Sequence, residues 1–533
     1  MKRATATNAG AMSQMLKSSG AIGVATLTSR VLGMVREIVY ANFMGDGAVA
    51  SAFKFAFSIP NLFRRLLGEG ALTAAFIPIF KEKERTAGEA EMWRAGNAVI
   101  SGLVAASAVV VAVVLVGISL GLATLSLGEE TRLMLRLLRV MFPYMPVICL
   151  TAIFMGMLNS RGQFFVPALG AALMNVVMIG AVFWVTPLMG EPLNVRVFGL
   201  AIGALLAGTA QAAYQLPNLR REGFRYRWVS PWRDATVREV MRKMVPGMLG
   251  VAAFQLNVML TNLVAFNVGG SILASFDYAV RLMELPQGVF GLSLATYLLP
   301  TLSGMAAEKK WEEFRGTLRQ GLGYLLFVNA LASVLLVVLA VPVVRLLFER
   351  GQFGADSTQN TALALAFLAP GLLAFSMVNI LGRAFYALGD THTPMRISIF
   401  CLVSNLVLAL ALVHGMRQAG LGLANTISSC VNVGLLIYAL RRKLGRLDFA
   451  PLRRQMAVVL LAVALAGAAA WWGGGVWERN VGHGSLAAKL GAVFAPAGLA
   501  ALVYWLVAIA LKLPTAWEVA GLAMGRLKRG KGE

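Results

Sequence analysis

The chain contains fourteen apolar stretches that are each long enough to cross a lipid bilayer. A hydrocarbon core about 30 Å thick requires about 20 mostly apolar residues in a helix. Charged residues make up 14% of the chain and hydrophobic residues 58%, whereas about a quarter of a soluble domain is charged. The sequence therefore predicts an all-α polytopic membrane protein with about 14 transmembrane helices, near residues 20–43, 50–79, 96–123, 133–158, 166–187, 196–217, 245–267, 271–302, 320–347, 361–388, 396–414, 420–440, 455–473 and 488–511.

Basic residues occur in every second loop between these stretches. The segment 218–243 contains eight Lys and Arg residues, and cations also follow the second, eighth and twelfth stretches, whereas the loop MGDGAVA has none. Loops rich in Lys and Arg stay in the cytoplasm, so we expect both termini to be cytoplasmic. Much of the net charge of +23 then reflects topology, with some attraction to anionic membrane lipids. This charge does not require a nucleic-acid partner.

A weak internal repeat divides the chain. The segment FMGDGAVASAFKFAFSIPN (43–61) aligns with FNVGGSILASFDYAVRLME (266–284) at an offset of 223 residues, which corresponds to six expected spans. An even number of spans preserves orientation, as in the parallel repeats of some transporters. We therefore expect two pseudo-symmetric six-helix lobes plus two extra C-terminal helices. The expected divisions are an N-terminal lobe 1–217, a basic cytoplasmic linker 218–243 containing a short amphipathic helix, a C-terminal lobe 244–440, and spans 13–14 with a basic tail in 441–533.

Several expected spans contain charged residues, although each one costs about 2.5–3.5 kcal/mol at a helix centre on insertion scales. Helical spacing places many of them on common faces. These polar stripes comprise Lys54, Ser58, Asn61 and Arg65 with Arg64 beside them and Glu69 beyond in the second span; Asp277, Arg281 and Glu284 in the eighth; and Ser376, Asn379, Arg383, Tyr386 and Asp390 in the tenth.

The first span, SRVLGMVRE and its flanks, contains Arg30, Arg36 and Glu37. Arg30 and Glu37 share a helix face but are separated by seven residues, a rise of about 10 Å, so we expect no direct pairing between them. Arg36 lies on a neighbouring face. We therefore expect the partners of these three side chains to come from other helices, water or a ligand. Arg281 differs, because Asp277 and Glu284 on its own helix offer it a purely structural ion pair.

Cations outnumber acids among these groups. If the stripes face one another, they line a hydrated positive cavity between the lobes. Guanidinium groups match phosphate oxygens in a bidentate geometry, so the favoured ligand is a diphosphate, and a carboxylate is the alternative. A scaffold that transports nothing would gain little from buried cations.

No enzyme motif is visible in the sequence. Walker A, HExxH, CxxC and GxSxG patterns are absent from it. Cys149, Cys401 and Cys430 lie in apolar runs without disulfide or metal spacing. We therefore expect no enzymatic activity, catalytic residue, cofactor or metal site.

Three segments resemble the MurJ (MviN) family of the MOP exporter superfamily: SRVLGMVRE (29–37), FSIPNLFRRLLGEGALTAAFIPIF (57–80) and YAVRLMELPQGVFGLSLATYLLP (278–300). The resemblance extends over essentially the whole chain. It implies that the protein flips lipid II, the undecaprenyl-diphosphate-linked peptidoglycan precursor, across the bacterial inner membrane by alternating access. The expected partners are lipid II itself, membrane lipids and other cell-wall synthesis proteins. The alternative is a MOP-type exporter of another polyprenyl-diphosphate-linked glycan.

The resemblance also suggests roles for individual residues. Its motifs match the first-span arginines, the second-span pair Asn61 and Arg64, and the eighth-span pair Arg281 and Glu284, which in the family lie in the cavity. Together with the stripes, this gives two sets of expected site residues: Arg30, Arg36, Asn61, Arg64, Arg281 and Arg383 for substrate binding, and Glu37, Lys54, Glu69, Asp277 and Glu284 for gating or ion pairing.

The chain departs from the family pattern at two acidic positions. Many members have an Asp where this chain has Ser51, and another where it has Val280, whereas Lys54 and Asp277 occur here in the same two helices. We hypothesise that the charges have been relocated as a pair. The seventh and eleventh spans also lack the acids with which some members bind sodium, so sodium coupling is not expected. The extra helix pair borders a groove that in the family is thought to hold the lipid tail, although its small residues equally suit ordinary helix packing.

Overall fold

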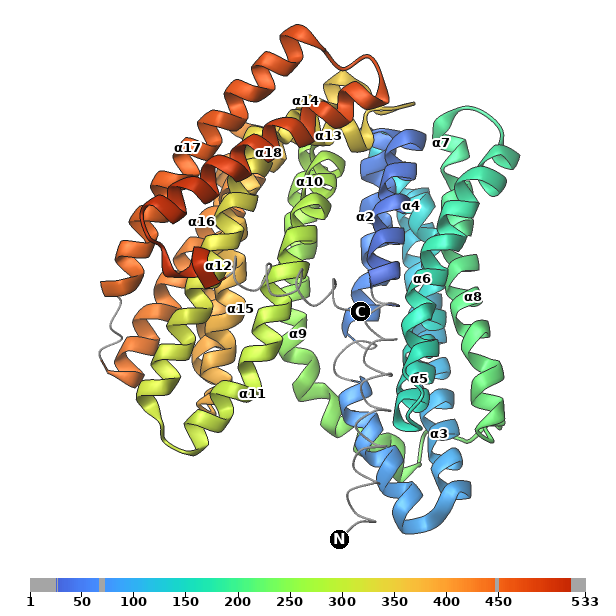
Figure 1. Ribbon diagram of the computed structural model, residues 1–533. Helices are drawn as coiled ribbons and strands as arrows, with labels where there is room; N and C mark the ends of the chain where they lie inside the picture. Colours follow the sequence, from blue (N-terminus) through green and yellow to red (C-terminus); the bar gives the residue numbers. More distant parts are fainter. Residues whose placement is uncertain (1–24, 26, 67–71, 446–449, 519–533) are drawn as a thin grey trace, which may run out of the picture. The chain divides into compact units, whose positions relative to one another are not determined.

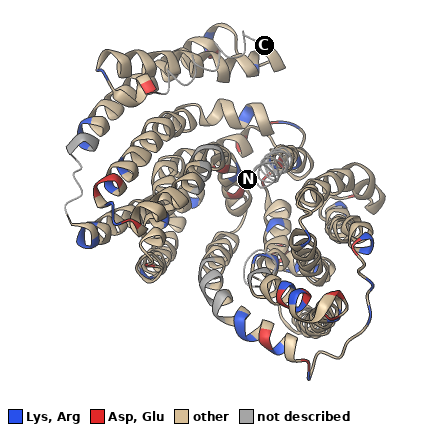
Figure 2. Ribbon diagram, turned by 60° about the horizontal axis from the view of Figure 1, so that its bottom comes forward, with Lys and Arg blue, Asp and Glu red and all other residues tan. Residues whose placement is uncertain are grey.

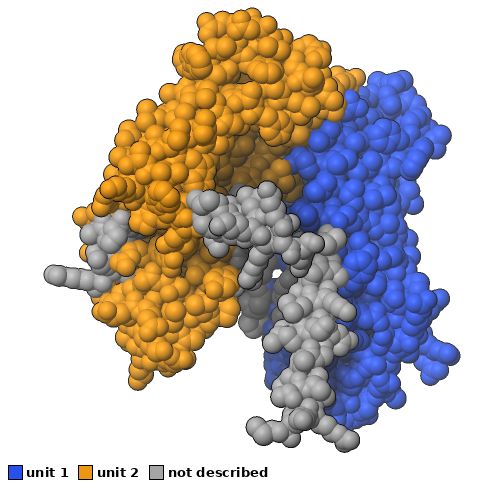
Figure 3. Space-filling view, in the orientation of Figure 1, with its two compact units in different colours: residues 1–270 blue, residues 271–533 orange. Residues whose placement is uncertain are grey.

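The computed structural model describes residue 25 and residues 27–66, 72–445 and 450–518. The regular elements of this part are all helical (Figure 1). The chain forms two compact units, Met1–Gly270 and Ser271–Glu533 (Figure 3). Within the described residues, seven helices are long and apolar enough to cross a membrane, or nine if two bent helix pairs each count as one span. The protein is therefore a multi-pass membrane protein.

Unit 1 begins with a helix over residues 27–44. Its core contains a chain of aromatic rings that joins four segments, in which Phe80, Trp93, Phe224 and Phe154 follow one another at centroid distances of 5.5, 5.7 and 6.0 Å. The helices that follow are α2 (Ala48–Phe63), α3 (Leu72–Thr124), α4 (Glu129–Met141), α5 (Tyr144–Ser160), α6 (Phe165–Gly180) with the turns η2 (Ala181–Val185) and η3 (Thr186–Met189), α7 (Leu193–Arg196), α8 (Phe198–Arg221) and α9 (Ala235–Val268).

Among the described residues, unit 2 has two apolar cores. One joins α11, α12, α15 and α16 around Phe314 and Phe385, and the other joins α12, α17 and α18 around Phe327 and Tyr504. The elements of this unit are α10 (Ile272–Pro286), η4 (Gln287–Leu292), α11 (Ser293–Ala307), α12 (Trp311–Val338), α13 (Ala340–Phe348), α14 (Ala355–Leu368), α15 (Gly371–Ala387), α16 (His392–Leu444), α17 (Ala450–Asn480) and α18 (Leu486–Ala510).

Several of the long helices are interrupted. In α3 Gly88 has φ +85°, and in α16 Arg417 has φ +51°, so each of these elements consists of two helices joined at a kink. Helices α4 and α5 meet at an angle of 45° just before Tyr144, and α14 and α15 meet at 45° just before Gly371. Pro143 and Pro370 are the N-cap residues that follow these two bends. A proline has no amide hydrogen to continue the preceding helix, which explains the break at each site.

A left-handed glycine turn precedes a helix of the predicted repeat in each half of the chain. Gly45, with φ +61°, lies between the first helix and α2, and Gly269, with φ +84°, ends α9 shortly before α10. Only glycine adopts these angles without strain.

The segment that joins α8 to α9 corrects a sequence prediction. We expected a short amphipathic helix within 218–243, but residues 224–231 have no helical structure. Gly223, with φ +94°, follows the end of α8, and Phe224 then enters the aromatic core with 2% of its surface exposed. Residues 222–234, named the strap below, are therefore held by contacts with α3 that their own sequence pattern does not reveal. Helical structure resumes at Ala235, where Asp234 caps α9.

Candidate functional site

Unit 1 contains a buried cluster of charged side chains between the first helix and α2. Arg36 donates to Glu37 Oε1 at 2.7 Å, and Lys54 of α2 donates to Glu37 Oε2 at 3.1 Å. The exposed fractions of the three side chains are 15% for Arg36, 5% for Glu37 and 9% for Lys54. Three of the sequence-predicted residues are thus brought together in one place.

Two further residues complete this cluster. Arg36 donates to Asn175 Oδ1 of α6 at 3.0 Å, while Asn175 Nδ2 donates to the carbonyl oxygen of Ser29 at 3.1 Å. The Arg36 guanidinium also lies 5.5 Å from the centre of the Tyr40 ring, a favourable cation–π position. The guanidinium is therefore held in a fixed orientation by an acid, an amide and an aromatic ring.

We expected the partners of the first-span charges to come from other helices, water or a ligand, and Lys54 of α2 and Asn175 of α6 confirm this in part. The pairing of Arg36 with Glu37 on its own helix corrects the rest of the expectation. Adjacent residues point in different directions on a helix, but the long arginine side chain reaches the neighbouring carboxylate. In these contacts two cations share one acid. Buried charges are costly unless they are paired, and guanidinium and ammonium groups are strong donors to phosphate oxygens.

The second-span stripe continues below this cluster in α2. Arg64 Nε donates to Asn61 Oδ1 at 2.7 Å, and Arg65 Nη1 reaches Gln255 Oε1 of α9 at 3.4 Å. The predicted pair Asn61 and Arg64 is thus in direct contact, and residues 64–66 form a wider, π-helical turn after α2. Glu69 lies outside the described residues.

In unit 2, Arg281 pairs on its own helix, as one of the alternatives predicted. Its distances are 3.0 Å to Glu284 and 3.8 Å to Asp277. All three side chains are at least 30% exposed, so these are solvent-accessible ion pairs rather than a buried cluster. The proposed relocation of charge to Lys54 and Asp277 as a pair stays a prediction.

The tenth-span stripe is less uniform than its spacing suggested. Ser376 is fully buried, and Arg383 is half-buried with no ion pair or hydrogen bond among the described residues. Asp390 lies beyond the end of α15 and binds Lys443 of α16 at 2.6 Å, and this bond holds the pKa of the Asp390 carboxyl well below its usual range. Asp390 is therefore a helix-terminal contact and not part of a continuous stripe.

Arg30 presents a different environment from that of Arg36. It is exposed, and within the described part of the chain it has no hydrogen bond or ion pair. An exposed arginine on an apolar helix fits a water-filled space or a phosphate-bearing ligand better than acyl chains.

Sequence reasoning missed three arginines of α4. Arg132, Arg136 and Arg139 are exposed, and none has an ion pair within the described residues. Their spacing of four and three residues places them on one face, opposite the buried face that contains Leu137 and Leu138. The i, i+4, i+7 pattern that revealed the other stripes would have found them.

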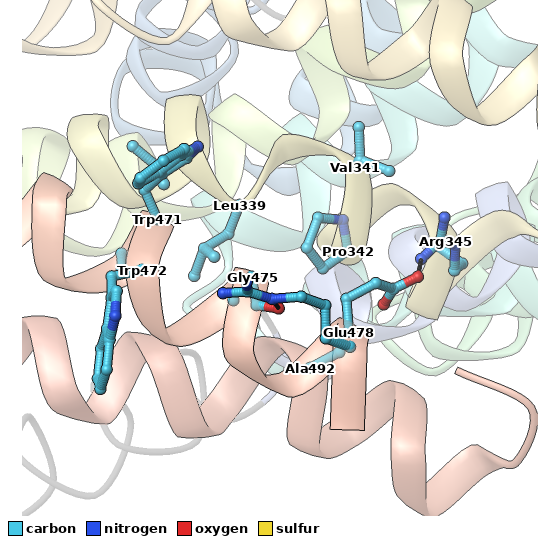
Figure 4. A pocket seen from close by; sticks show the side chains of 13 residues that line it. Leu339, Val341, Pro342, Arg345, Trp471, Trp472, Gly475, Glu478 and Ala492 are labelled. Atoms are coloured by element: carbon cyan, nitrogen blue, oxygen red, sulfur yellow. Dashed lines mark hydrogen bonds and ion pairs between the residues drawn. The ribbon is translucent and has the colours of Figure 1, made fainter. Parts of the chain in front are cut away.

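A separate cavity lies in unit 2 and contains none of the predicted site residues (Figure 4). Its volume is about 630 Å³. Trp471, Trp472 and Leu339 form an apolar part, while Arg345 and Glu478 pair at 3.3 Å in its polar part. The described residues contain no cluster of His, Cys, Asp or Glu that could hold a metal ion.

Comparisons with known proteins place the chain in a family. Residues 40–491 match the family model described as lipid II flippase MurJ. A probable lipid II flippase MurJ of Vibrio cholerae is 33% identical, covering 81% of this chain and 85% of its own. One from Rhizobium tropici is 31% identical, covering 97% and 96%.

Solved structures agree on the fold. A structure of lipid II flippase MurJ in an inward closed conformation is 22% identical, covers 91% of this chain and 97% of its own, and has a TM-score of 0.74. An inward-facing MATE family multidrug transporter of the MOP superfamily is 17% identical, covers 79% and 96%, and has a TM-score of 0.63. With the extensive family match and the sequence identity to its relatives, these findings establish that the chain belongs to the MurJ lipid II flippase family.

Proposed function

We propose that this membrane transporter, which is not an enzyme, flips lipid II from the cytoplasmic to the periplasmic leaflet of the bacterial inner membrane. The observation that carries the proposal is the buried cluster of unit 1, in which two cations share one acid. A lipid-linked diphosphate supplies oxygens to which such cations donate strong hydrogen bonds. Arg30, which is exposed and has no partner among the described residues, is the first contact for the phosphate, and Arg36 is the second.

The proposed topology has fourteen spans with both termini in the cytoplasm. The kinks at Gly88 and Arg417 support it, because each divides one long helical element into two segments. Six spans then form an N-terminal lobe, six form a C-terminal lobe, and α17 and α18 form the extra pair. Alternating access of these lobes moves the diphosphate group, with Asn61, Arg64, Arg281 and Arg383 as further contacts and the acidic residues as gate partners.

Depletion of the protein in its native cell tests the function. Total lipid II and the fraction reached by a membrane-impermeant reagent are measured separately. We expect lipid II to accumulate while its externally accessible fraction falls. Unchanged peptidoglycan synthesis with loss of a different surface glycan would instead identify an exporter of another polyprenyl-diphosphate-linked glycan.

An Arg30→Ala variant tests the proposed site in the same cells. It should reach wild-type protein levels and fail to restore external lipid II, because the exposed cation is lost while no internal contact is broken. Arg454→Ala, which removes an exposed arginine at the start of α17, is the matched control and should restore growth. A fully active Arg30→Ala protein would exclude Arg30 from substrate transfer.

A further inference from the structure

The strap is fixed along one side of α3. Asn97 donates to the carbonyl oxygen of Arg225 at 3.0 Å, and the amide of Val229 donates to Ser101 Oγ at 3.3 Å. Pro231 lies against Gly102, where an added Cβ would be 3.3 Å from the proline ring. The inner side of the strap is therefore occupied by contacts from Asn97 to Gly102. Figure 1 shows the strap joining α8 to α9.

The surface of α3 changes from charged to apolar along its length. The N-terminal part of α3 bears many charges up to Arg94, and exposed valines begin at Val104, which is 40% exposed, and continue to Val116, which is 59% exposed. Ten residues separate Arg94 from Val104, a rise of about 15 Å. The strap contacts α3 within this interval, between its charged and its apolar part, which is the position expected for lipid headgroups.

The acids of this region already have partners. Glu222 binds Arg161 at 3.0 Å, Asp234 binds Arg94 at 2.8 Å, and Glu239 binds Lys243 at 2.7 Å. The remaining cations are exposed arginines, and within the described part of the chain none of them has a carboxylate partner. They are Arg220, Arg221, Arg225, Arg227, Arg233, Arg238 and Arg242; Lys and Arg are blue in Figure 2.

Aromatic side chains alternate with these arginines. Trp228 is 59% exposed, Trp232 is 74% exposed and Tyr226 is 49% exposed. Two exposed tryptophan side chains are unfavourable in bulk water because their rings are largely apolar, whereas indole rings are favoured at the level of lipid headgroups. Met241 and Val245, which are also exposed, add apolar surface on the first turns of α9.

We infer that the strap and the first turns of α9, up to residue 245, form a docking surface for anionic phospholipid headgroups of the adjacent leaflet. The arginines bind the phosphates, and Trp228 and Trp232 enter the interface between headgroups and acyl chains. Basic and aromatic surfaces also suit nucleic acids, but this surface lies at the bilayer border of a membrane-spanning helix. The inference is independent of the transported substrate.

Lipid titration of the purified full-length protein tests the inference. Retention of phosphatidylglycerol and of phosphatidylcholine is measured by native mass spectrometry for the wild type and for Arg225→Gln/Arg227→Gln/Arg233→Gln. A basic residue near an anionic surface contributes about 1 kcal/mol, so three substitutions should weaken phosphatidylglycerol binding on the order of 100-fold. Phosphatidylcholine retention should not change. Because these side chains are exposed, the fold should be preserved, and an unaltered unfolding temperature checks this.

The matched control removes three other exposed arginines, Arg441, Arg442 and Arg454, and should weaken phosphatidylglycerol binding by much less. Equal losses in the two triple variants would overturn the inference, because they would reflect net charge and not this surface. Equal phosphatidylglycerol binding by the wild type and by Arg225→Gln/Arg227→Gln/Arg233→Gln would also overturn the inference. A nucleic acid or an acidic protein would then be the partner to test.

A local readout separates the strap from the rest of the protein. A fluorophore on Ser230→Cys, in a Cys430→Ser background, should become protected from an aqueous quencher when phosphatidylglycerol is added to nanodiscs. High salt should reverse this protection, and Trp228→Ala/Trp232→Ala should reduce it. Trp471→Ala/Trp472→Ala is the aromatic control and should leave it unchanged. A label that is equally accessible in phosphatidylcholine and phosphatidylglycerol nanodiscs would refute the proposed docking.

Discussion

Replacing Glu37 with glutamine removes the carboxylate that binds both Arg36 and Lys54. Breaking a buried ion pair by removing one partner typically costs about 3–5 kcal/mol, because the remaining charge is buried without compensation. The Glu37 side chain is only 5% exposed, so we expect Glu37→Gln to lower the free energy of unfolding by an amount in this range. Lys54→Met should cost less, about 1.5–3 kcal/mol for one hydrogen bond to a charged group, because Glu37 still has Arg36.

The double variant provides the sharper result. Once Lys54 is replaced, Glu37→Gln leaves only one cation without its acid, so the double variant should be more stable than the sum of the single effects predicts. We expect a coupling free energy of about 1–3 kcal/mol. The measurement is unfolding in mixed micelles by increasing sodium dodecyl sulfate, applied to the wild type, both single variants and the double variant.

An ion pair of unit 2 serves as the control. Arg281 and Glu284 are 32% and 49% exposed, and exposed pairs contribute about 0–1 kcal/mol. Glu284→Gln should therefore change the unfolding free energy by less than about 1 kcal/mol. If the Glu37 and Lys54 effects add to within about 0.5 kcal/mol, the side chains are not coupled and the description of one shared acid is wrong.

Two further predictions concern packing and pH. Gly208→Ala should lower the unfolding free energy by about 1–3 kcal/mol, because the new Cβ would lie 2.6 Å from the Tyr144 ring. Gly117→Ala is the control and should not lower it, because nothing lies within 4 Å of its new Cβ. Equal effects in the two variants would contradict this. The stabilisation that depends on Asp390 should be present at neutral pH and decrease only below the ordinary Asp pKa of about 3.9, because Lys443 lowers the folded-state pKa. A stability difference between the wild type and Asp390→Asn that decreases between pH 7 and 5 would refute this assignment.

Local spacing predicted some of the site well. An ion pair of Arg281 with Asp277 or Glu284 on its own helix was one predicted alternative, and both contacts are present, because residues three and four apart share a helix face. The family and the all-helical membrane fold were also predicted from the sequence. The assignment of lobes and the substrate roles of individual residues stay predictions.

Contacts between distant segments could not be predicted in the same way. Asn175 meets Arg36 across 139 residues of sequence, and no spacing rule connects the two positions. A short amphipathic helix was expected within the linker 218–243, which includes the strap. Its conformation is instead set by Asn97 and Ser101 of α3, which occupy its backbone and polar groups.

The bends before α5 and α15 are shared by both halves of the repeat and are positions where a helix can change its angle. Each breaks an expected span, the fourth and the tenth, at a proline, and the two prolines are 227 residues apart, close to the offset of 223 between the aligned segments. A helix that is already interrupted can change its angle without losing further backbone hydrogen bonds. Each half of the chain therefore has its own helix bend, at a similar position in the repeat. A change of access between the two sides of the membrane can then come from bending within one half of the chain. The helices before and after each proline bend would move as rigid segments.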